Sequence, residues 1–125
     1  MGNREKLKNA RNTLLKLHKS LIDFERELYE GMHGQLTAGQ FLNVLIDNED
    51  FGWLRKFSML IVEIDEMFDL KDGISEEMVD ASLAKVVELV EMREDDEYFR
   101  AKYKNGIQQS VDAAGHQSAL KAILE

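Results

Sequence analysis

The sequence contains neither cysteine nor proline, and these two absences restrict both its chemistry and its secondary structure. Without cysteine there is no disulfide, no thiolate metal site, no iron–sulfur cluster and no thiol nucleophile. Without proline, helices continue until glycine or a polar cap ends them. Threonine occurs only at Thr13 and Thr37, so the β-branched residues that favour strands are scarce. We therefore expect an all-α protein.

The chain also lacks the motifs of common active sites. It has no glycine-rich phosphate loop and no nucleophile elbow. Glu30 and His33 make a single Glu-x-x-His motif, whereas a di-iron bundle needs a pair of them plus further glutamates. Aligning Gly73 to the EF-hand glycine would put Phe68 and Leu70 at ligand positions, which excludes calcium binding there. We expect no metal and no cofactor, and we favour a protein that is not an enzyme.

Long hydrophobic runs are absent too. The longest falls far below the roughly 18 residues of a transmembrane helix, so we expect no membrane partner. The first residues lead into an amphipathic helix without an apolar signal region, and we therefore expect a cytoplasmic protein. The 125 residues fit one domain, so we assign residues 1–125 to a single helical bundle.

Charge is abundant but unevenly spread. The chain has 16 basic and 24 acidic residues, a net charge of −8. Residues 1–20 hold six basic residues and one acid, whereas residues 37–97 hold five basic residues and seventeen acids. Phosphate contacts need clustered lysine and arginine, so this balance argues against a nucleic-acid partner. It favours instead a basic helix that packs beside an acidic one.

Apolar residues recur at helical spacing in four principal segments, joined by shorter helices. The first runs from about Arg4 to Met32, with Asn3 as its N-cap and Gly34 as its stop. Its heptad positions a and d carry Leu7, Ala10, Leu14, Leu17, Leu21, Phe24 and Leu28. A capping box at Thr37 predicts the start of a short helix. Further helices are predicted over 51–70 with Asp50 as the cap, after the cap Ser75, in a segment that ends at Gly106, and over 108–124. An acidic junction at 94–97 precedes the segment that ends at Gly106.

Polar residues interrupt the apolar faces of two of these helices. The first helix carries Arg11, His18 and Glu25 at its e positions, and the 51–70 helix carries Ser58 and Asp65 at the equivalent positions. Buried polar groups must find hydrogen-bond partners. If the two helices run antiparallel with matched heptads, His18 lies level with Asp65, and Glu25 with Ser58.

Arg26 and Arg55 are close enough in sequence to join this group. Two interpretations stay open. The residues form a structural polar network that fixes which helices pair. Alternatively they line a small pocket in which His18 acts as acid, base or ligand anchor, with Asp65 orienting it.

The 51–70 helix has too little polar face for an exposed position, which favours cover by a second subunit. Met59 and Val62 lie toward its outer side. Together with Trp53, which also belongs to an aromatic cluster typical of a core, they make up the candidate interface. We expect a homodimer.

Residues 51–66, FGWLRKFSMLIVEIDE, resemble the central motif of a family of small bacterial proteins of unknown function. Residues 17–21, 25–30 and 99–103, with His116, are similar as well, so the likeness covers about residues 14–124. The family pattern has proline at the position of Lys56. The resemblance implies an all-helical domain and assigns no reaction. It singles out His18, Glu25, Arg26, Trp53, Arg55, Ser58 and Asp65.

These features together predict a non-enzymatic cytoplasmic helical bundle that acts as a protein-interaction or regulatory module and self-associates. Its protein partner is not identified by the sequence. The alternative is a small-ligand-binding protein or enzyme that uses His18 and Asp65 in a pocket between the 4–32 and 51–70 helices.

Overall fold

The computed structural model describes residues 2–93 and 95–125. Its helices are α1 (Asn3–His33), α2 (Ala38–Asp47), the 3-10 helix η1 (Glu49–Leu54), α3 (Arg55–Phe68), α4 (Glu76–Val90), α5 (Glu97–Gln109) and α6 (Val111–Leu124). The described ranges contain no strand, and the expected all-α bundle is confirmed. Nor does any helix in these ranges have the length and apolar character needed to cross a bilayer.

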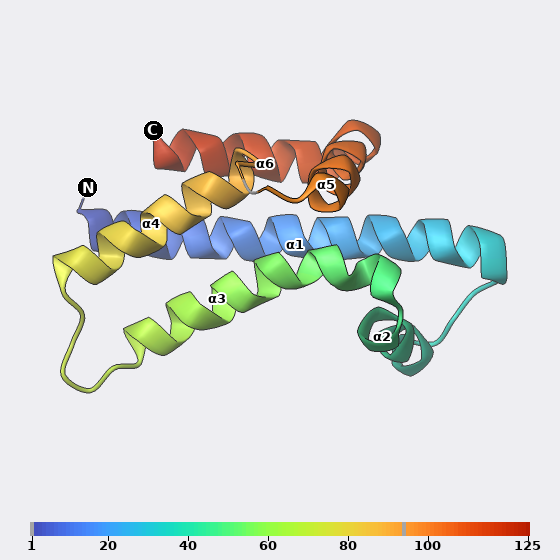
Figure 1. Ribbon diagram of the computed structural model, residues 1–125, viewed down its shortest axis with the longest axis horizontal. Coiled ribbons are helices and arrows are strands. Elements are labelled where there is room, and N and C mark those ends of the chain that lie inside the picture. The colour runs from blue at the N-terminus through green and yellow to red at the C-terminus, as the bar shows by residue number, and fades with distance from the viewer. Residues whose placement is uncertain (1, 94) are drawn as a thin grey trace.

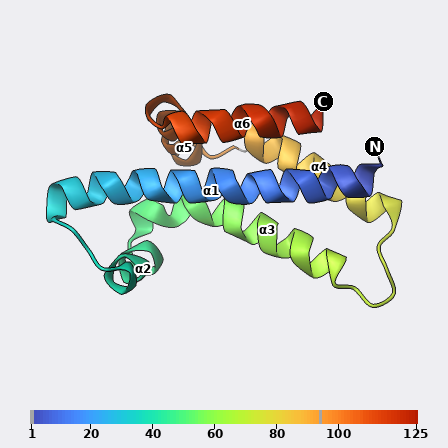
Figure 2. The same ribbon diagram turned by 180° about the vertical axis from the view of Figure 1, so that it is seen from behind.

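Helix α1 runs the length of the molecule, and the other helices pack around it (Figure 1). Helices α3 and α6 run antiparallel to α1, α4 runs in the same sense as α1, and α2 and α5 cross its direction (Figure 2). The side chains of Leu7, Leu14 and Leu21 are fully buried, as the heptad pattern predicts. Leu28 is half-exposed because α1 extends past α6 at this end.

Three predicted helix ends are confirmed. Thr37 and Gln40 form a reciprocal capping box at the start of α2. The hydroxyl of Ser75 accepts a hydrogen bond from the backbone N–H of Met78 and so caps α4. Gly34 ends α1 with φ = +89°, a backbone conformation that residues with a Cβ rarely adopt.

Two predicted N-caps are wrong. Gly2, not Asn3, precedes the first turn of α1, and the Asn3 side chain donates instead to Asp80 on α4. Asn48, not Asp50, caps the next segment, because its side chain accepts from the Asp50 backbone N–H. The predicted 51–70 helix therefore begins as the 3-10 helix η1 and becomes an α-helix only at Arg55.

The predicted helix stop at Gly106 is wrong, because α5 continues to Gln109. The residue is buried against α1, and a Cβ built on it would lie 2.6 Å from Leu21 Cδ2. Glycine is needed here because α5 crosses α1 at close range. The acidic junction does separate α4 from α5, although Glu94 itself lies outside the described residues.

The close approach at Gly106 predicts that Gly106→Ala destabilises the fold by about 1 kcal/mol or more, since the new methyl group overpacks a closed core. Gly115→Ala is the matched control. Gly115 also lies inside a helix but has nothing within 4 Å of its added Cβ, so alanine should stabilise by about 0.4–1 kcal/mol. Urea unfolding of both variants measures the difference. Equal stability of the two would contradict the proposed contact.

Candidate functional site

The strongest polar contact between α1 and α3 joins Arg11 to Asp65. Both carboxylate oxygens of Asp65 accept hydrogen bonds, one from Nε and one from Nη2 of Arg11, each at 2.8 Å. This bidentate geometry is stronger than a single charged hydrogen bond, and it raises the pKa of Arg11. The predicted pairing of His18 with Asp65 is therefore not made. The antiparallel arrangement is right, but the register differs by one heptad.

His18 packs on the aromatic core instead of on a carboxylate. Its ring stacks on Phe57, with centroids 5.9 Å apart and planes inclined by 15°. Burial lowers the pKa of His18, and a backbone hydrogen bond with Leu54 opposes this shift. The neutral imidazole therefore packs against the aromatic core at Phe57.

Phe57 is the centre of an aromatic cluster. Its ring lies 6.2 Å from Trp53, 5.9 Å from Phe99 and 5.2 Å from Tyr103. The pairs of Phe57 with Trp53 and Tyr103 are edge-to-face, and such pairs contribute about 0.5–1.5 kcal/mol each beyond area burial. Trp53 is only 4% exposed, so its assignment to the candidate interface is wrong. It faces inward because η1 turns the aromatic side of this segment toward α5.

Glu25 is the most buried of the predicted polar residues, with 4% of its surface exposed. Its Oε1 lies 3.6 Å from Nζ of Lys102 on α5. Burial raises the pKa of Glu25, and Lys102 partly offsets this shift. Ser58, its predicted partner, donates instead to the Arg55 carbonyl in its own helix at 3.1 Å.

Arg26 and Arg55 each hold a chain connection in place. Arg26 Nη2 donates to the carbonyl of Leu36 at 2.8 Å and so fastens the segment after α1. Arg55 Nη2 donates to the carbonyl of Ile46 at 2.9 Å and so fastens the end of α2 to α3. Apart from the hydrogen bond of Ser58 to the Arg55 carbonyl, the six predicted residues therefore take different partners, and they do not form one network.

Five pockets on the surface of the described part of the chain are lined by other side chains, and none of these five opens onto this group of residues. Within the described residues, no three histidine, aspartate or glutamate side chains come together as metal ligands. These contacts do not support the alternative interpretation of a pocket beside His18 and Asp65, because Arg11 binds Asp65 and the His18 ring stacks on Phe57.

Arg11 and Lys102 were not predicted as the charged partners of Asp65 and Glu25. A signal for Arg11 was present, because it occupies the e position one heptad before His18 and carries the charge that Asp65 needs. No comparable signal marked Lys102, because the crossing of α5 over α1 brings it to Glu25.

Comparison with known proteins leaves the site unassigned. No family model matches the chain, and no curated protein or solved structure matches it either. The resemblance to a family of small bacterial proteins therefore stays a prediction.

We expect His18 and Glu25 to change the stability in opposite directions as the pH falls. Because the folded-state pKa of His18 is lowered, its contribution is present at neutral pH and is lost as the pH falls below the unfolded value of about 6.5. Because the folded-state pKa of Glu25 is raised, its protonation adds stability as the pH falls toward 4.5. His18→Phe should therefore reduce the loss of stability between neutral pH and about pH 5, and Glu25→Gln should enlarge it.

Urea unfolding at a series of pH values measures both slopes. Leu15→Gln, which changes an exposed position of α1 that carries no titratable group, is the control and should leave the wild-type slope unchanged. Parallel profiles for wild type and His18→Phe would contradict the burial of a neutral His18.

Proposed function

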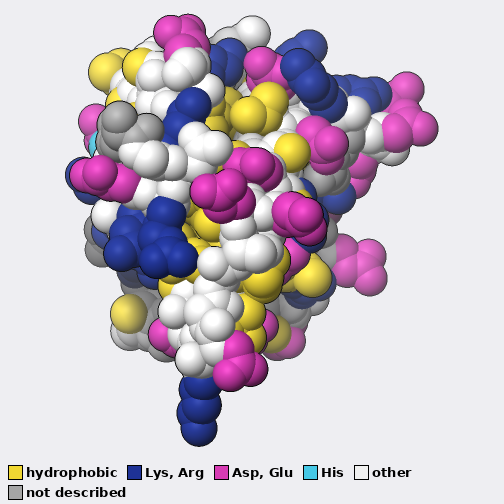
Figure 3. Space-filling model, turned by 90° about the vertical axis from the view of Figure 1, so that its left-hand side faces the viewer, with side chains coloured by type: hydrophobic (Ala, Val, Ile, Leu, Met, Phe, Trp, Pro, Cys, Tyr) yellow, Lys and Arg dark blue, Asp and Glu magenta, His cyan; other side chains and the backbone are white. Residues whose placement is uncertain are grey.

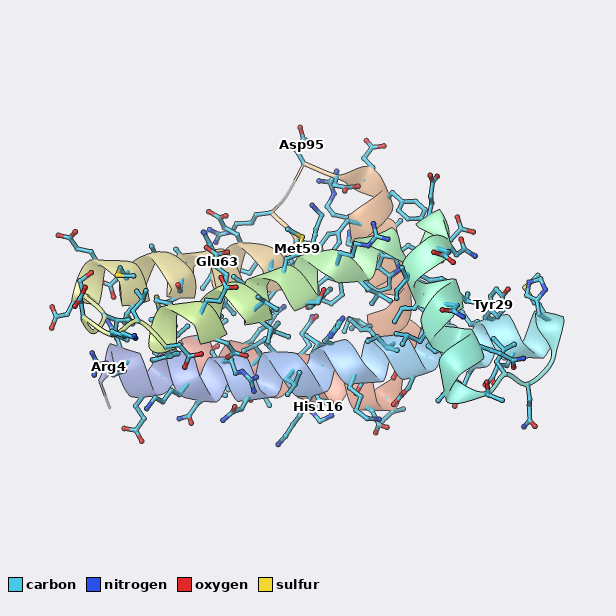
Figure 4. All side chains as sticks on the ribbon, turned by 90° about the horizontal axis from the view of Figure 1, so that it is seen from below. Arg4, Tyr29, Met59, Glu63, Asp95 and His116 are labelled. Atoms are coloured by element: carbon cyan, nitrogen blue, oxygen red, sulfur yellow. The ribbon has the colours of Figure 1, made fainter. Side chains whose placement is uncertain are left out.

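We propose that this protein is a non-enzymatic, cytoplasmic interaction module that self-associates through the outer surface of α2 and α3. The observation that carries the proposal is the exposure of Met59 and Val62 on α3, at 70% and 53%. Figure 4 shows Met59 on the side of α3 away from α1. Exposed apolar side chains that gather on one face are typical of protein contacts.

Exposed apolar side chains also lie on α2. Leu42 and Ile46 lie one turn apart on α2, and each has more than half of its surface exposed. The hydrogen bond from Arg55 to the Ile46 carbonyl joins the end of α2 to the start of α3. We name this face the α2–α3 surface and define it by Leu42, Ile46, Arg55, Met59 and Val62.

The local charge suits contact between two copies. Residues 38–62 contain three acids and two basic residues, a net charge of −1, although the whole chain carries −8. Two copies can therefore meet at this surface without the repulsion that the rest of the acidic chain would impose. In a two-fold contact, Arg55 can also face an acidic residue at the edge of the opposite copy.

The separation of the polar residues further supports this proposal over a ligand pocket. Both oxygens of the Asp65 carboxylate accept hydrogen bonds from Arg11, and the His18 ring stacks on Phe57. Both side chains therefore have partners inside the bundle, which favours a structural role for them. The function is therefore expected at the outer surface of the bundle.

Sedimentation equilibrium tests the self-association. We expect a reversible dimer, and we expect Met59→Asp to weaken it by about tenfold or more, because a desolvated carboxylate opposes the apolar contact. Val111→Asp is the matched control, since Val111 is 87% exposed on α6, outside the α2–α3 surface. A wild-type chain that stays monomeric at its highest soluble concentration would contradict the proposal, as would equal effects of the two variants.

A further inference from the structure

A groove between α3 and α4 forms a second surface with a different character. Its cavity volume is about 340 Å³. Met67 and Ser82 make its buried floor, and the half-exposed side chains of Leu70 and Met78 form one end. The groove is lined by Glu63, Glu66, Met67, Leu70, Met78, Ala81, Ser82 and Lys85.

The side chains that line the groove favour an apolar partner surface, and they can adapt to its shape. The hydroxyl of Ser82 contacts Met67 Sδ at 3.5 Å, so the one polar group in the floor is already engaged. Unbranched, polarizable methionine side chains such as Met67 and Met78 adapt to different partner surfaces. The groove therefore offers shape and apolar area rather than directed hydrogen bonds.

The rim of the groove is acidic. Glu63 pairs with Lys85 across the groove, whereas the carboxylate of Glu66 makes no ion pair among the described residues. The charged side chains that line the groove are Glu63, Glu66 and Lys85, a net charge of −1. The surrounding segment, residues 63–91, contains ten acids and two basic residues, a net charge of −8. Figure 3, which looks at the end where α4 begins, shows acidic and hydrophobic side chains lying next to one another.

We propose that this groove binds a basic amphipathic helix of a partner protein. The helix would lay its apolar face on Leu70 and Met78 and place a lysine or arginine over Glu66. The lining on the α3 side runs from Glu63 to Leu70, about 10.5 Å along the helix, so the groove can contact about two turns of a partner helix. Anionic partners such as nucleic acid or acidic lipid are repelled by the same charge.

A second copy of this chain does not provide such a helix. The basic residues Arg4, Lys8 and Lys16 of α1 are exposed, but the leucine stripe of that helix is buried in its own core. Two copies of the acidic groove would also repel each other. This inference extends the proposed interaction role to a second surface, and it does not depend on self-association.

Fluorescence anisotropy with a synthetic probe tests the inference. The probe is a labelled helical peptide of about 14 residues with leucine at i, i+3, i+4 and i+7 and lysine elsewhere. It is titrated into the Met59→Asp protein, so that self-association does not contribute. We expect saturable binding that weakens with salt, and we expect no binding of the same peptide with glutamate in place of lysine.

Variants locate the binding site. Glu66→Lys and Met78→Gln change the rim and the apolar wall of the groove, and each should weaken binding of the lysine peptide by about tenfold. Glu27→Lys and Leu28→Gln make the same kinds of change on the exposed end of α1 and should leave binding unchanged. Equal losses in groove and control variants would overturn the inference, as would binding of both peptides alike.

The two proposals fail independently. If the groove variants bind the peptide normally while wild-type protein still dimerises, only the groove inference is lost. If the peptide dissociates the wild-type dimer, the groove belongs to the contact between copies, and the inference of a separate partner is overturned.

Discussion

The apolar stripe along α1 is the constraint on which the other helices depend. Helices α3, α4, α5 and α6 all pack on this one helix, whose Leu7, Leu14, Leu17 and Leu21 side chains are fully buried. Complete burial of a leucine contributes about 1.5–3 kcal/mol, so the stripe provides a large share of the core. Because a single helix supplies the shared surface, each neighbour is placed by its contact with α1. Gly106 shows how closely α5 packs on α1, because a Cβ at this position would lie 2.6 Å from Leu21 Cδ2.

Polar side chains then set the position of each helix along α1. Arg11 fixes α3 through Asp65, and Glu25 meets Lys102 of α5. Apolar contacts alone tolerate sliding, whereas a bidentate ion pair has only one good geometry. The residues whose chemistry first suggested a pocket thus determine how the helices are arranged. Their engagement inside the bundle leaves its outer surfaces for contact with other molecules.

The sequence pattern predicted the helices better than their relative positions. The heptad repeat identified the buried face of α1, and the capping residues Thr37 and Ser75 marked helix starts. The register of α3 against α1 was missed by one heptad, because a heptad repeat looks the same after such a shift. Trp53 was misassigned because a segment that is apolar on most sides does not reveal which side faces the core. The groove between α3 and α4 needed both helices in place before Leu70 and Met78 could be seen together.

The two outer surfaces differ in charge, because the α2–α3 surface is nearly neutral and the groove between α3 and α4 is acidic. Self-association requires that a second copy covers the α2–α3 surface. Oxidation of methionine by hydrogen peroxide, followed by peptide mass spectrometry, measures this directly. Met59 lies on the α2–α3 surface, whereas Met32 is 82% exposed at the far end of α1 and serves as the internal reference. The account predicts that the oxidation rate of Met59 relative to Met32 falls as the protein concentration rises. A ratio that stays constant over the full concentration range would contradict it.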